Sequence, residues 1–282
     1  MKVHGRDHRA TRQIACVPCF RAEFAILLLL ILATVWQAAS TQPTDTTPTI
    51  GPSPLTVEQV VRNLAQMNLH RVEALHAYQA TRIYRVVYLG FPANRNAEMV
   101  VKVNYLSPGK KEFIIQSATG SELIVDRVLK KLLEAEKEAM GPEIQQRSAL
   151  TDDNYRFTLI GYESTPSGSM YVLSVEPRRK DKFLYQGRIW VDARDFAVVR
   201  IEAEPVKNPS FWTRKTDIVQ VYTKVSEFWL PAYNHSVTSI RLGGNADLTI
   251  EYTGYKITDA SQVSSLEIPR STLRAEAKHA QE

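Results

Sequence analysis

Residues 183–205, FLYQGRIWVDARDFAVVRIEAEP, decide what kind of fold this chain can form. Apolar strand formers stand on both sides of a short polar connection, DARD at residues 192–195. Aspartate side chains in such a connection accept hydrogen bonds from backbone N–H groups a residue or two further on, which stabilises a turn. The stretch therefore predicts a β-hairpin.

The same pattern of strand, polar turn and strand recurs along most of the chain. Tyrosine and β-branched residues, which suit pleated strands, dominate these runs. Because the connections are short, neighbouring strands are expected to run antiparallel. The hairpin supplies two of about ten expected strands, and the others are residues 81–91, 97–105, 111–117, 155–162, 170–177, 215–225, 232–242 and 247–257.

Residues 55–78 have the strongest helical periodicity in the chain. Their apolar side chains recur at helical spacing and form one stripe, and Thr56 is placed to cap the helix. We expect this stripe to pack on the concave face of the sheet. The residues that make this contact in our prediction are Val57, Val61, Leu64 and Met67.

A second helix is predicted over residues 122–140. Leucine and valine residues form an apolar side, and alternating Lys and Glu residues, among them Glu136, form a charged side. We interpret the charged side as a solvated face that is stabilised by pairs four residues apart. Gly141-Pro142 is expected to end the helix.

Several expected strands are apolar on both sides, whereas a sheet covered on one face alternates more cleanly between apolar and polar residues. We therefore expect a single antiparallel sheet that curves around helices or a cavity. In residues 81–91 one side carries Ile83, Val87 and Leu89, and the other carries Tyr84, Val86 and Tyr88.

The charge of the chain argues against a nucleic-acid partner. The formal net charge is +5, but residues 1–40 contribute +3 of it and leave only +2 for the rest of the chain. A nucleic-acid surface needs a clustered basic face. We therefore expect no nucleic-acid binding.

Residues 1–40 have the layout of a targeting segment. A basic region precedes the apolar run 24–36, and the small residues Ala38, Ala39 and Ser40 follow it. This predicts a secretory signal peptide that is cleaved near Ala39 or Ser40. An N-terminal membrane anchor is the alternative, since the basic region is long and Gln37 disturbs the cleavage site. Either reading places the remaining chain in the periplasm, with membrane contact through this segment if it stays uncleaved.

The only two cysteines, Cys16 and Cys19, precede the apolar run and have no second pair to complete a metal site. We expect no function for them, and a cleaved chain would contain no disulfide. Beyond the targeting segment we expect a Pro/Thr-rich linker over 41–54, one domain over 55–260 and a polar tail over 261–282.

No pattern of catalytic or metal-binding residues stands out. His70, Glu73 and His76 are spaced at i, i+3 and i+6, whereas a metal pair on a helix prefers i, i+4. There is no Gly-x-Ser-x-Gly elbow and no Gly-rich phosphate loop. Turn formation explains Asp192 and Asp195, so we expect no catalytic residue, no metal and no cofactor.

Two aromatic pairs lie in connections between the expected strands. Phe211 and Trp212 follow Asn208-Pro209-Ser210, and Phe228 and Trp229 precede Leu230-Pro231, where Pro231 is expected to break the strand. Each pair either plugs the end of the core or forms an exposed lip that contacts a partner, a lipid or a ligand.

The order of these elements resembles the outer-membrane lipoprotein-sorting proteins of the LolA/LolB-like superfamily. The resemblance covers residues 55–258 and rests on IWVDARDFAVVRIEAEP, NPSFW, FWLP and LTIEYTGYKI in this order after two helices and a strand meander. It implies a mainly β fold with helices, in which about 10–11 strands form an unclosed β-barrel. It also implies helices on the concave side and an apolar cavity that holds acyl chains. Envelope regulators of the RseB type share this architecture.

Alternate strand residues point to opposite sides, so one phase of each strand would line such a cavity. The phase that we choose consists of Ile83, Val87, Val101, Phe113, Phe157, Leu173 and Val199.

The leading functional hypothesis is a non-enzymatic periplasmic carrier that binds lipids or the acyl chains of lipoproteins. The alternative is an envelope regulatory or scaffold module that binds a protein partner. A secreted hydrolase is the third hypothesis, and it would require a convergent Ser, His and acid cluster.

Overall fold

The computed structural model describes residues 49–50, 53–165, 168–208, 213–241 and 243–258. The predicted targeting segment, most of the linker and the predicted polar tail lie outside these residues, as do Phe211 and Trp212. Among the described residues no helix has the length and the apolar character needed to cross a membrane.

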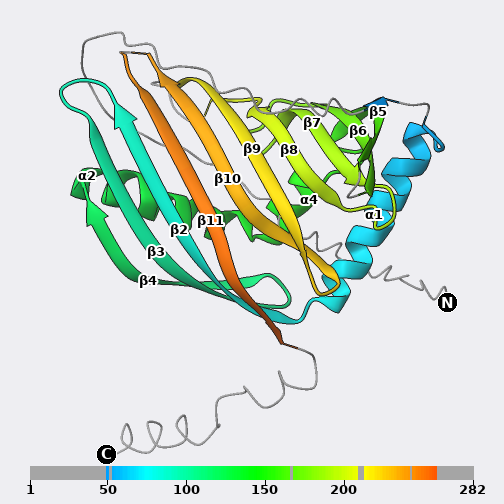
Figure 1. Cartoon of the computed structure of the whole chain (residues 1–282), viewed down its shortest axis with the longest axis horizontal. Helices are drawn as coiled ribbons and strands as arrows, with labels where there is room; N and C mark the ends of the chain where they lie inside the picture. The colour runs from blue at the N-terminus through cyan, green and yellow to red at the C-terminus, as the bar shows by residue number, and fades with distance from the viewer. Residues whose placement is uncertain (1–48, 51–52, 166–167, 209–212, 242, 259–282) are drawn as a thin grey trace, which may run out of the picture.

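One antiparallel sheet of eleven strands forms the body of the protein, in the order β1-β5-β6-β7-β8-β9-β10-β11-β2-β3-β4 (Figure 1). Its end strands, β1 and β4, do not pair with each other, so the barrel is unclosed. The strands are β1 (Thr49–Ile50), β2 (Ala77–Leu89), β3 (Arg95–Leu106), β4 (Lys110–Gly120), β5 (Tyr155–Thr165), β6 (Gly168–Pro177), β7 (Tyr185–Asp192), β8 (Val198–Pro205), β9 (Thr213–Val225), β10 (Phe228–Ile240) and β11 (Asn245–Thr258).

The expected single antiparallel sheet is therefore confirmed. The predicted hairpin of residues 183–205 is β7 and β8, in which Ile189 lies opposite Ile201. The strand that the sequence analysis did not anticipate is β1, two residues that pair with the outer end of β5. Because β11 pairs with β2, the first and last long strands lie in the middle of the sheet rather than at its ends.

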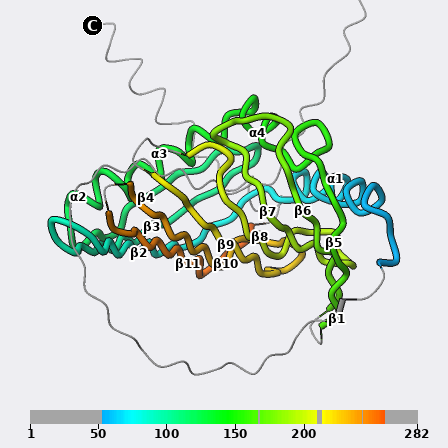
Figure 2. The backbone as a smooth tube through the Cα atoms, turned by 90° about the horizontal axis from the view of Figure 1, so that it is seen from above, coloured from blue at the N-terminus to red at the C-terminus, as the bar shows by residue number. Residues whose placement is uncertain are grey.

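The helices lie beside one face of this sheet (Figure 2). The long predicted helix of residues 122–140 is one nearly continuous element whose middle turn is π-helical. It ends at Ala139, just before Gly141-Pro142, as predicted, and Pro142 also starts another helix, in the first-turn position that proline tolerates. The helical elements are α1 (Val57–Ala74), α2 (Glu122–Ile124), the π-helical turn η1 (Val125–Leu129), α3 (Lys130–Ala139) and α4 (Pro142–Ser148).

Local interactions explain where α1 begins. Gln59 donates its backbone N–H to the Thr56 side chain at 3.4 Å, and its own side chain accepts the Thr56 backbone N–H at 2.9 Å. This reciprocal capping box satisfies two N–H groups that the first turn would otherwise leave unpaired. The helix buries Val60, Val61 and Leu64.

Two apolar clusters fill most of the inner face. The first lies between strands β2, β3, β10 and β11 and the cover formed by α2, η1 and α3; Met99, Val101 and Leu129 at its centre are fully buried. The second lies between α1 and strands β5 to β8, with Leu64, Leu173 and Ile189 fully buried.

The predicted packing of α1 is confirmed in part. Val61 and Leu64 belong to the buried core, and Val57 packs partly buried against it. Met67 is only half-buried and belongs to neither cluster, while Val60 takes a central place that our prediction omitted.

Candidate functional site

The first apolar cluster contains a group of buried charges that attaches the helical cover to the sheet. Arg82 of β2 donates from Nη1 to Glu136 Oε2 of α3 at 2.6 Å and from Nη2 to Oε1 at 3.2 Å. Lys111 of β4 donates from Nζ to the same Oε1 at 2.7 Å. The three side chains are 3%, 10% and 3% exposed for Arg82, Glu136 and Lys111. We call these three residues the buried triad.

The charges of the triad control how its carboxyl group ionises. Burial alone raises the pKa of Glu136, but the positive charges and hydrogen bonds of Arg82 and Lys111 outweigh it and lower the pKa to about 2. Arg82 also donates to Tyr84 Oη at 3.2 Å. Burial raises the pKa of Tyr84 to about 12, against the opposing effect of Arg82. The carboxylate therefore stays ionised, and the phenol stays neutral, over the physiological pH range.

Aromatic rings surround the triad. The Arg82 guanidinium carbon lies 4.9 Å from the centroid of the Tyr252 ring and 5.6 Å from that of Phe113. Such contacts stabilise a desolvated cation. The buried triad is thus a polar attachment inside an otherwise apolar and aromatic contact between cover and sheet.

The other helix, α1, is also held to the sheet by an arginine. Arg71 donates from Nη1 to the carbonyl of Phe196 at 3.2 Å and from Nη2 to the carbonyl of Asp195. Both carbonyls belong to the turn between β7 and β8. The last turn of α1 is therefore tied to the hairpin that the sequence singled out.

The two aspartates of this turn act differently from each other. Asp192 Oδ1 accepts the backbone N–H groups of Arg194 at 2.9 Å and Asp195 at 2.7 Å, as expected for turn formation. The Asp195 side chain instead accepts from Lys224 Nζ at 2.6 Å and Trp229 Nε1 at 2.8 Å. Turn formation alone therefore does not account for Asp195, which links the hairpin to β9 and β10.

A row of buried polar residues on β9 and β10 separates the two apolar clusters on the inner face. The amide Nδ2 of Asn234 donates to Gln220 Oε1 at 2.9 Å. Thr216 and Thr238 join their hydroxyl groups across the strands at 3.0 Å. Among the described residues, Asn234 Oδ1 and Ser236 Oγ are buried without a hydrogen-bond partner. The inner face therefore offers unused hydrogen-bonding atoms between its two apolar regions.

The predicted cavity-lining residues divide into two groups. Val101 and Leu173 are fully buried on the inner face, and Phe113 and Phe157 pack partly buried against the same clusters. Whether any of them contacts a ligand remains a prediction.

Our face assignment of β2 is wrong. The inner face of this strand carries Arg82, Tyr84, Val86 and Tyr88, so Ile83 and Val87 point outward, and Val87 is 44% exposed. The strand is apolar on both sides, which left the choice of face open. In β8 the register shifts so that Val191 lies opposite Val198, and Val198 rather than Val199 packs against the inner cluster.

The pair Phe228 and Trp229 lies within a strand instead of in a connection. β10 begins at Phe228 and runs through Pro231, where the pairing with β9 shifts by a residue instead of ending. Phe228 packs partly buried against a third apolar cluster that includes Leu75, Tyr78 and Leu230. Trp229 is bound to Asp195, as described above.

Sequence reasoning missed the buried triad. Glu136 was assigned to a solvated face, yet it follows Leu129, Leu132 and Leu133 at spacings of seven, four and three residues, which places all four on one side of a helix. This spacing is the feature of the sequence that could have predicted a buried Glu136. Nothing in the sequence joins Glu136 to Arg82 and Lys111, which come from two other elements.

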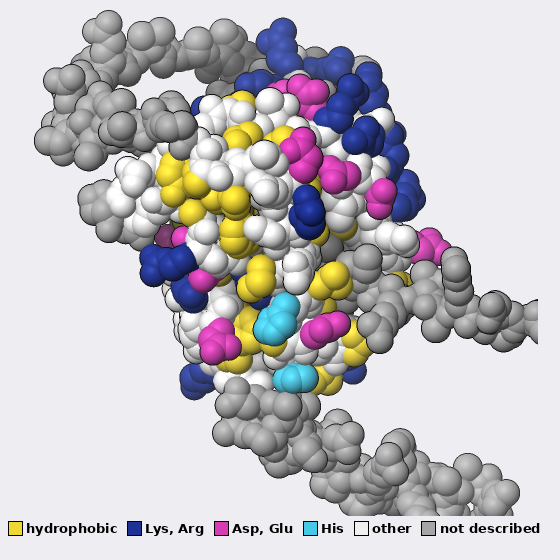
Figure 3. Space-filling model, turned by 90° about the vertical axis from the view of Figure 1, so that its right-hand side faces the viewer, with side chains coloured by type: hydrophobic (Ala, Val, Ile, Leu, Met, Phe, Trp, Pro, Cys, Tyr) yellow, Lys and Arg dark blue, Asp and Glu magenta, His cyan; other side chains and the backbone are white. Residues whose placement is uncertain are grey.

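Among the described residues no group of three or more His, Cys, Asp or Glu side chains is arranged to hold a metal ion. On the face at the right of Figure 1, Lys and Arg side chains gather towards one corner (Figure 3). This corner exposes its charged side chains to solvent, whereas the buried triad encloses them.

No family model matches the chain, and no curated protein matches it at a significant level. Solved structures with similar folds include a DUF1329 family protein from Desulfovibrio piger, with 13% identity, coverage of 77% of this chain and 98% of that chain, and a TM-score of 0.38. An outer membrane lipoprotein-sorting domain from Vibrio parahaemolyticus has 11% identity, coverage of 78% and 98%, and a TM-score of 0.35.

A LolA superfamily protein from Nitrosomonas europaea has 13% identity, coverage of 73% of this chain and 94% of that chain, and a TM-score of 0.32. The chain is thus similar in structure, at low sequence identity, to LolA superfamily proteins and lipoprotein-sorting domains.

Proposed function

We propose that this protein binds the acyl chains of lipids or lipoproteins on the inner face of its sheet, beneath the cover formed by α2, η1 and α3. The binding involves no catalysis. The targeting segment predicted over residues 1–40 would place this activity in the periplasm.

The buried triad is the observation that supports this proposal most. Three buried charged groups lose hydration, and well-packed apolar residues would hold a permanently closed core at least as well. Charged groups regain hydration when they separate into water, so an ionic attachment is suited to a cover that lifts and closes again. The π-helical turn η1 lies within this cover, and such turns are frequent at functional sites.

An acyl chain would take over contacts that the cover makes in the closed protein. Val101 and Met99 are fully buried beneath it, so the cover has to move before a ligand reaches them. Each methylene group that leaves water contributes about 0.8 kcal/mol, so a long chain can replace these contacts without a polar anchor. The oxygen atoms of Asn234 and Ser236 that lack a hydrogen-bond partner among the described residues would bind the polar end of such a ligand.

The test compares the wild type with the variant Arg82→Met/Lys111→Met/Glu136→Leu, which keeps the packing and removes the ionic attachment. Uptake of a fluorescent fatty acid should be slowed at least tenfold in this variant, because the cover can no longer exchange its contacts for water. The matched control is Arg85→Met/Glu98→Leu, which removes the exposed ion pairs of Arg85 with Glu98 at 2.8 Å and with Glu251 at 2.7 Å and should leave uptake unchanged. Native mass spectrometry of the wild type from its host envelope should show a co-purifying lipid.

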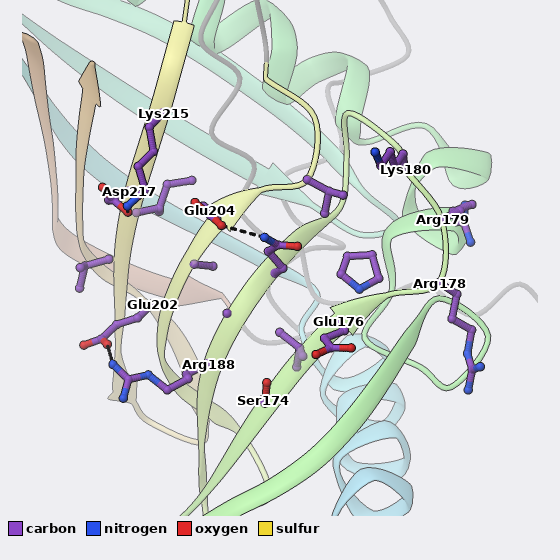
Figure 4. A pocket seen from close by; sticks show the side chains of 18 residues that line it. Ser174, Glu176, Arg178, Arg179, Lys180, Arg188, Glu202, Glu204, Lys215 and Asp217 are labelled. Atoms are coloured by element: carbon purple, nitrogen blue, oxygen red, sulfur yellow. Dashed lines mark hydrogen bonds and ion pairs between the residues drawn. The ribbon is translucent and has the colours of Figure 1, made fainter. Parts of the chain in front are cut away.

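The proposal fails if the folded wild type takes up no fatty acid, phospholipid or acylated peptide at micromolar concentration. A binding module for a protein partner is the second candidate function. A groove of about 870 Å³ on another part of the sheet favours it, because charged side chains such as Arg188, Glu202 and Asp217 line it, and these suit a protein partner better than an acyl chain (Figure 4).

A further inference from the structure

The two edges of the sheet are covered unequally (Figure 1). At one edge β1 pairs with Glu163 and Ser164 of β5, and helix α1 packs against the same strand. At the other edge β4 pairs only with β3 among the described residues. The residues directly before and after β4, 107–109 and Ser121, are described as well. In this part of the chain the sheet therefore ends at a strand with a single neighbour.

Strand β4 is open to solvent along most of its length. Every residue from Ile114 to Gly120 is exposed, and the two isoleucines Ile114 and Ile115 are 42% and 41% exposed. Edge strands of natural proteins usually carry charges, a proline or a covering element that prevents pairing with another chain. Residues 113–119, FIIQSAT, contain no charge and no proline. This edge therefore lacks most of the features that keep sheets from pairing edge to edge.

The pairing with β3 gives the face of each β4 residue, because residues directly opposite each other share a face. Three residues lie opposite fully buried residues of β3 and therefore belong to the inner face. They are Phe113, Ile115 and Ala118. The outer-face residues are Glu112, Ile114, Ser117 and Thr119. Gln116 is an extra residue, a β-bulge, because the register with β3 shifts there, so the alternation of faces changes phase at Gln116.

We propose that two copies of this protein associate edge to edge, with β4 of one copy antiparallel to β4 of the other around a two-fold axis. Such an interface is self-complementary, because the same surface of each copy takes part and every contact occurs twice. The backbone N–H and C=O groups at the free edge of β4 would gain hydrogen-bond partners, and the sheet would continue from one copy into the next. This inference goes beyond acyl-chain binding, and its test does not depend on that binding.

The bulge selects the register of this pairing. Because the faces change phase at Gln116, pairing along the whole strand matches inner with inner and outer with outer residues only when the two-fold axis passes between Ile115 and Gln116. A shift of one residue places inner residues opposite outer ones. In the matching register, the residues that lie opposite each other in the two copies are Phe113 and Ala118, Ile114 and Ser117, and Glu112 and Thr119.

The side chains that meet in this register are compatible with each other. On the inner face the large ring of Phe113 lies opposite the small side chain of Ala118 of the second copy. Like charges directly opposite each other destabilise a pair of strands. None occurs here, because Lys111 lies opposite Gly120 and the residue opposite Glu112 is uncharged. The sequence of β4 therefore suits a second copy of itself as the neighbouring strand.

The first experiment tests the register by disulfide trapping in the full-length protein. Cys16 and Cys19 are replaced with serine, because they are the only cysteines of the chain. Ile114→Cys/Ser117→Cys should form a covalent dimer on mild oxidation, since the Cα atoms of opposite residues lie about 4.5–5.5 Å apart, within the range that a disulfide spans. The matched control is Ile114→Cys/Thr119→Cys, whose cysteines would be displaced by roughly 7 Å along the strand and should give at least fivefold less dimer.

The second experiment measures self-association by sedimentation velocity at micromolar concentration. Ile114→Glu/Ser117→Glu should weaken association at least tenfold, because two pairs of like charges then lie opposite each other. Ile114→Lys/Ser117→Lys should do the same, and an equal mixture of the two variants should associate again, because each Glu then lies opposite a Lys. The control Val87→Lys/Leu89→Lys adds the same charges at exposed positions of β2, away from the edge, and should leave association unchanged.

Circular dichroism of each variant separates a loss of association from a loss of folding. A wild type that sediments as a monomer at these concentrations would overturn the proposal and leave the edge of β4 to an extended segment of another protein. Equal disulfide yields from the two cysteine pairs would overturn it as well. So would association that persists in both charged variants, because it would have to use another surface.

Discussion

Arg82 on β2 holds Glu136 on α3 through two hydrogen bonds, at 2.6 and 3.2 Å, although 54 residues separate them in the chain. The pair is buried, and Lys111 completes its hydrogen bonding from a third element. This relationship fixes where the helical cover lies on the sheet. It also gives the most direct way to test how the cover is attached.

Replacing Glu136 with glutamine should destabilise the protein by about 3–5 kcal/mol, because Arg82 and Lys111 would stay buried without a negative partner. Urea unfolding followed by circular dichroism measures this loss. The control is Glu134→Gln, which removes an ion pair to Lys131 whose side chains are 62% and 53% exposed. That change should alter the unfolding free energy by less than about 1 kcal/mol, and similar losses in the two variants would contradict the burial of the triad.

The same carboxylate should make stability depend on pH in a defined range. Its pKa is about 2 in the folded protein and near the ordinary value of 4.5 once unfolded, because burial is outweighed by the two cations. A lowered folded pKa contributes stability that is fully present above pH 4.5 and is lost as the pH falls towards 2. The difference in unfolding free energy between wild type and Glu136→Gln should therefore shrink from pH 5 to pH 2, and a constant difference would refute the assignment.

The face assignment of β2 is testable with adjacent residues. Val86 is 2% exposed and Val87 is 44% exposed, so their side chains lie on opposite faces. Val86→Asp should destabilise the protein by more than about 3 kcal/mol, because an unpaired carboxylate is costly in an apolar core. Val87→Asp should cost less than about 1 kcal/mol, as is usual for an exposed site. Thermal unfolding of both variants measures these losses of stability. A larger loss for Val87→Asp than for Val86→Asp would support the face predicted from the sequence.

Gly187 in β7 should tolerate no side chain. Its φ of +150° is unfavourable for other residues, and an added Cβ would lie 2.2 Å from the carbonyl oxygen of Glu202 on β8. Gly187→Ala should therefore destabilise the hairpin by at least about 1–3 kcal/mol. Chemical unfolding compares it with Gln186→Ala at the adjacent exposed position, which should behave nearly like the wild type.

The secondary structure was largely predictable from local patterns. The hairpin of residues 183–205 was predictable because its turn residues and its strand formers both indicate two paired strands. Helix α1 was predictable because its capping residue and its apolar stripe both indicate a helix. Where local signals conflicted, prediction failed. Pro231 argued for a break, but a shift in the pairing of β10 with β9 accommodates it within the strand.

The site was less predictable, since it depends on which face of each strand turns inward. Val101 and Leu173 were placed correctly on the inner face. Ile83 and Val87 were not, because β2 is apolar on both sides and its inner face contains an arginine that local reasoning treats as exposed. Arg82 is buried only because Glu136 compensates its charge there.

The sequence by itself determined the period of each element, the turns between strands and the antiparallel order, because these depend on neighbouring residues and short connections. Only the tertiary structure decided the inward faces, the buried triad and the point at Ala203 and Ile218 where the pairing between β8 and β9 ends. Those features depend on side chains and strand edges that lie far apart in the chain and meet only when the sheet curves beneath its helices. A charge or a strand edge has no fixed environment in the sequence, and the partners that fold against it decide whether it is buried, paired or left open.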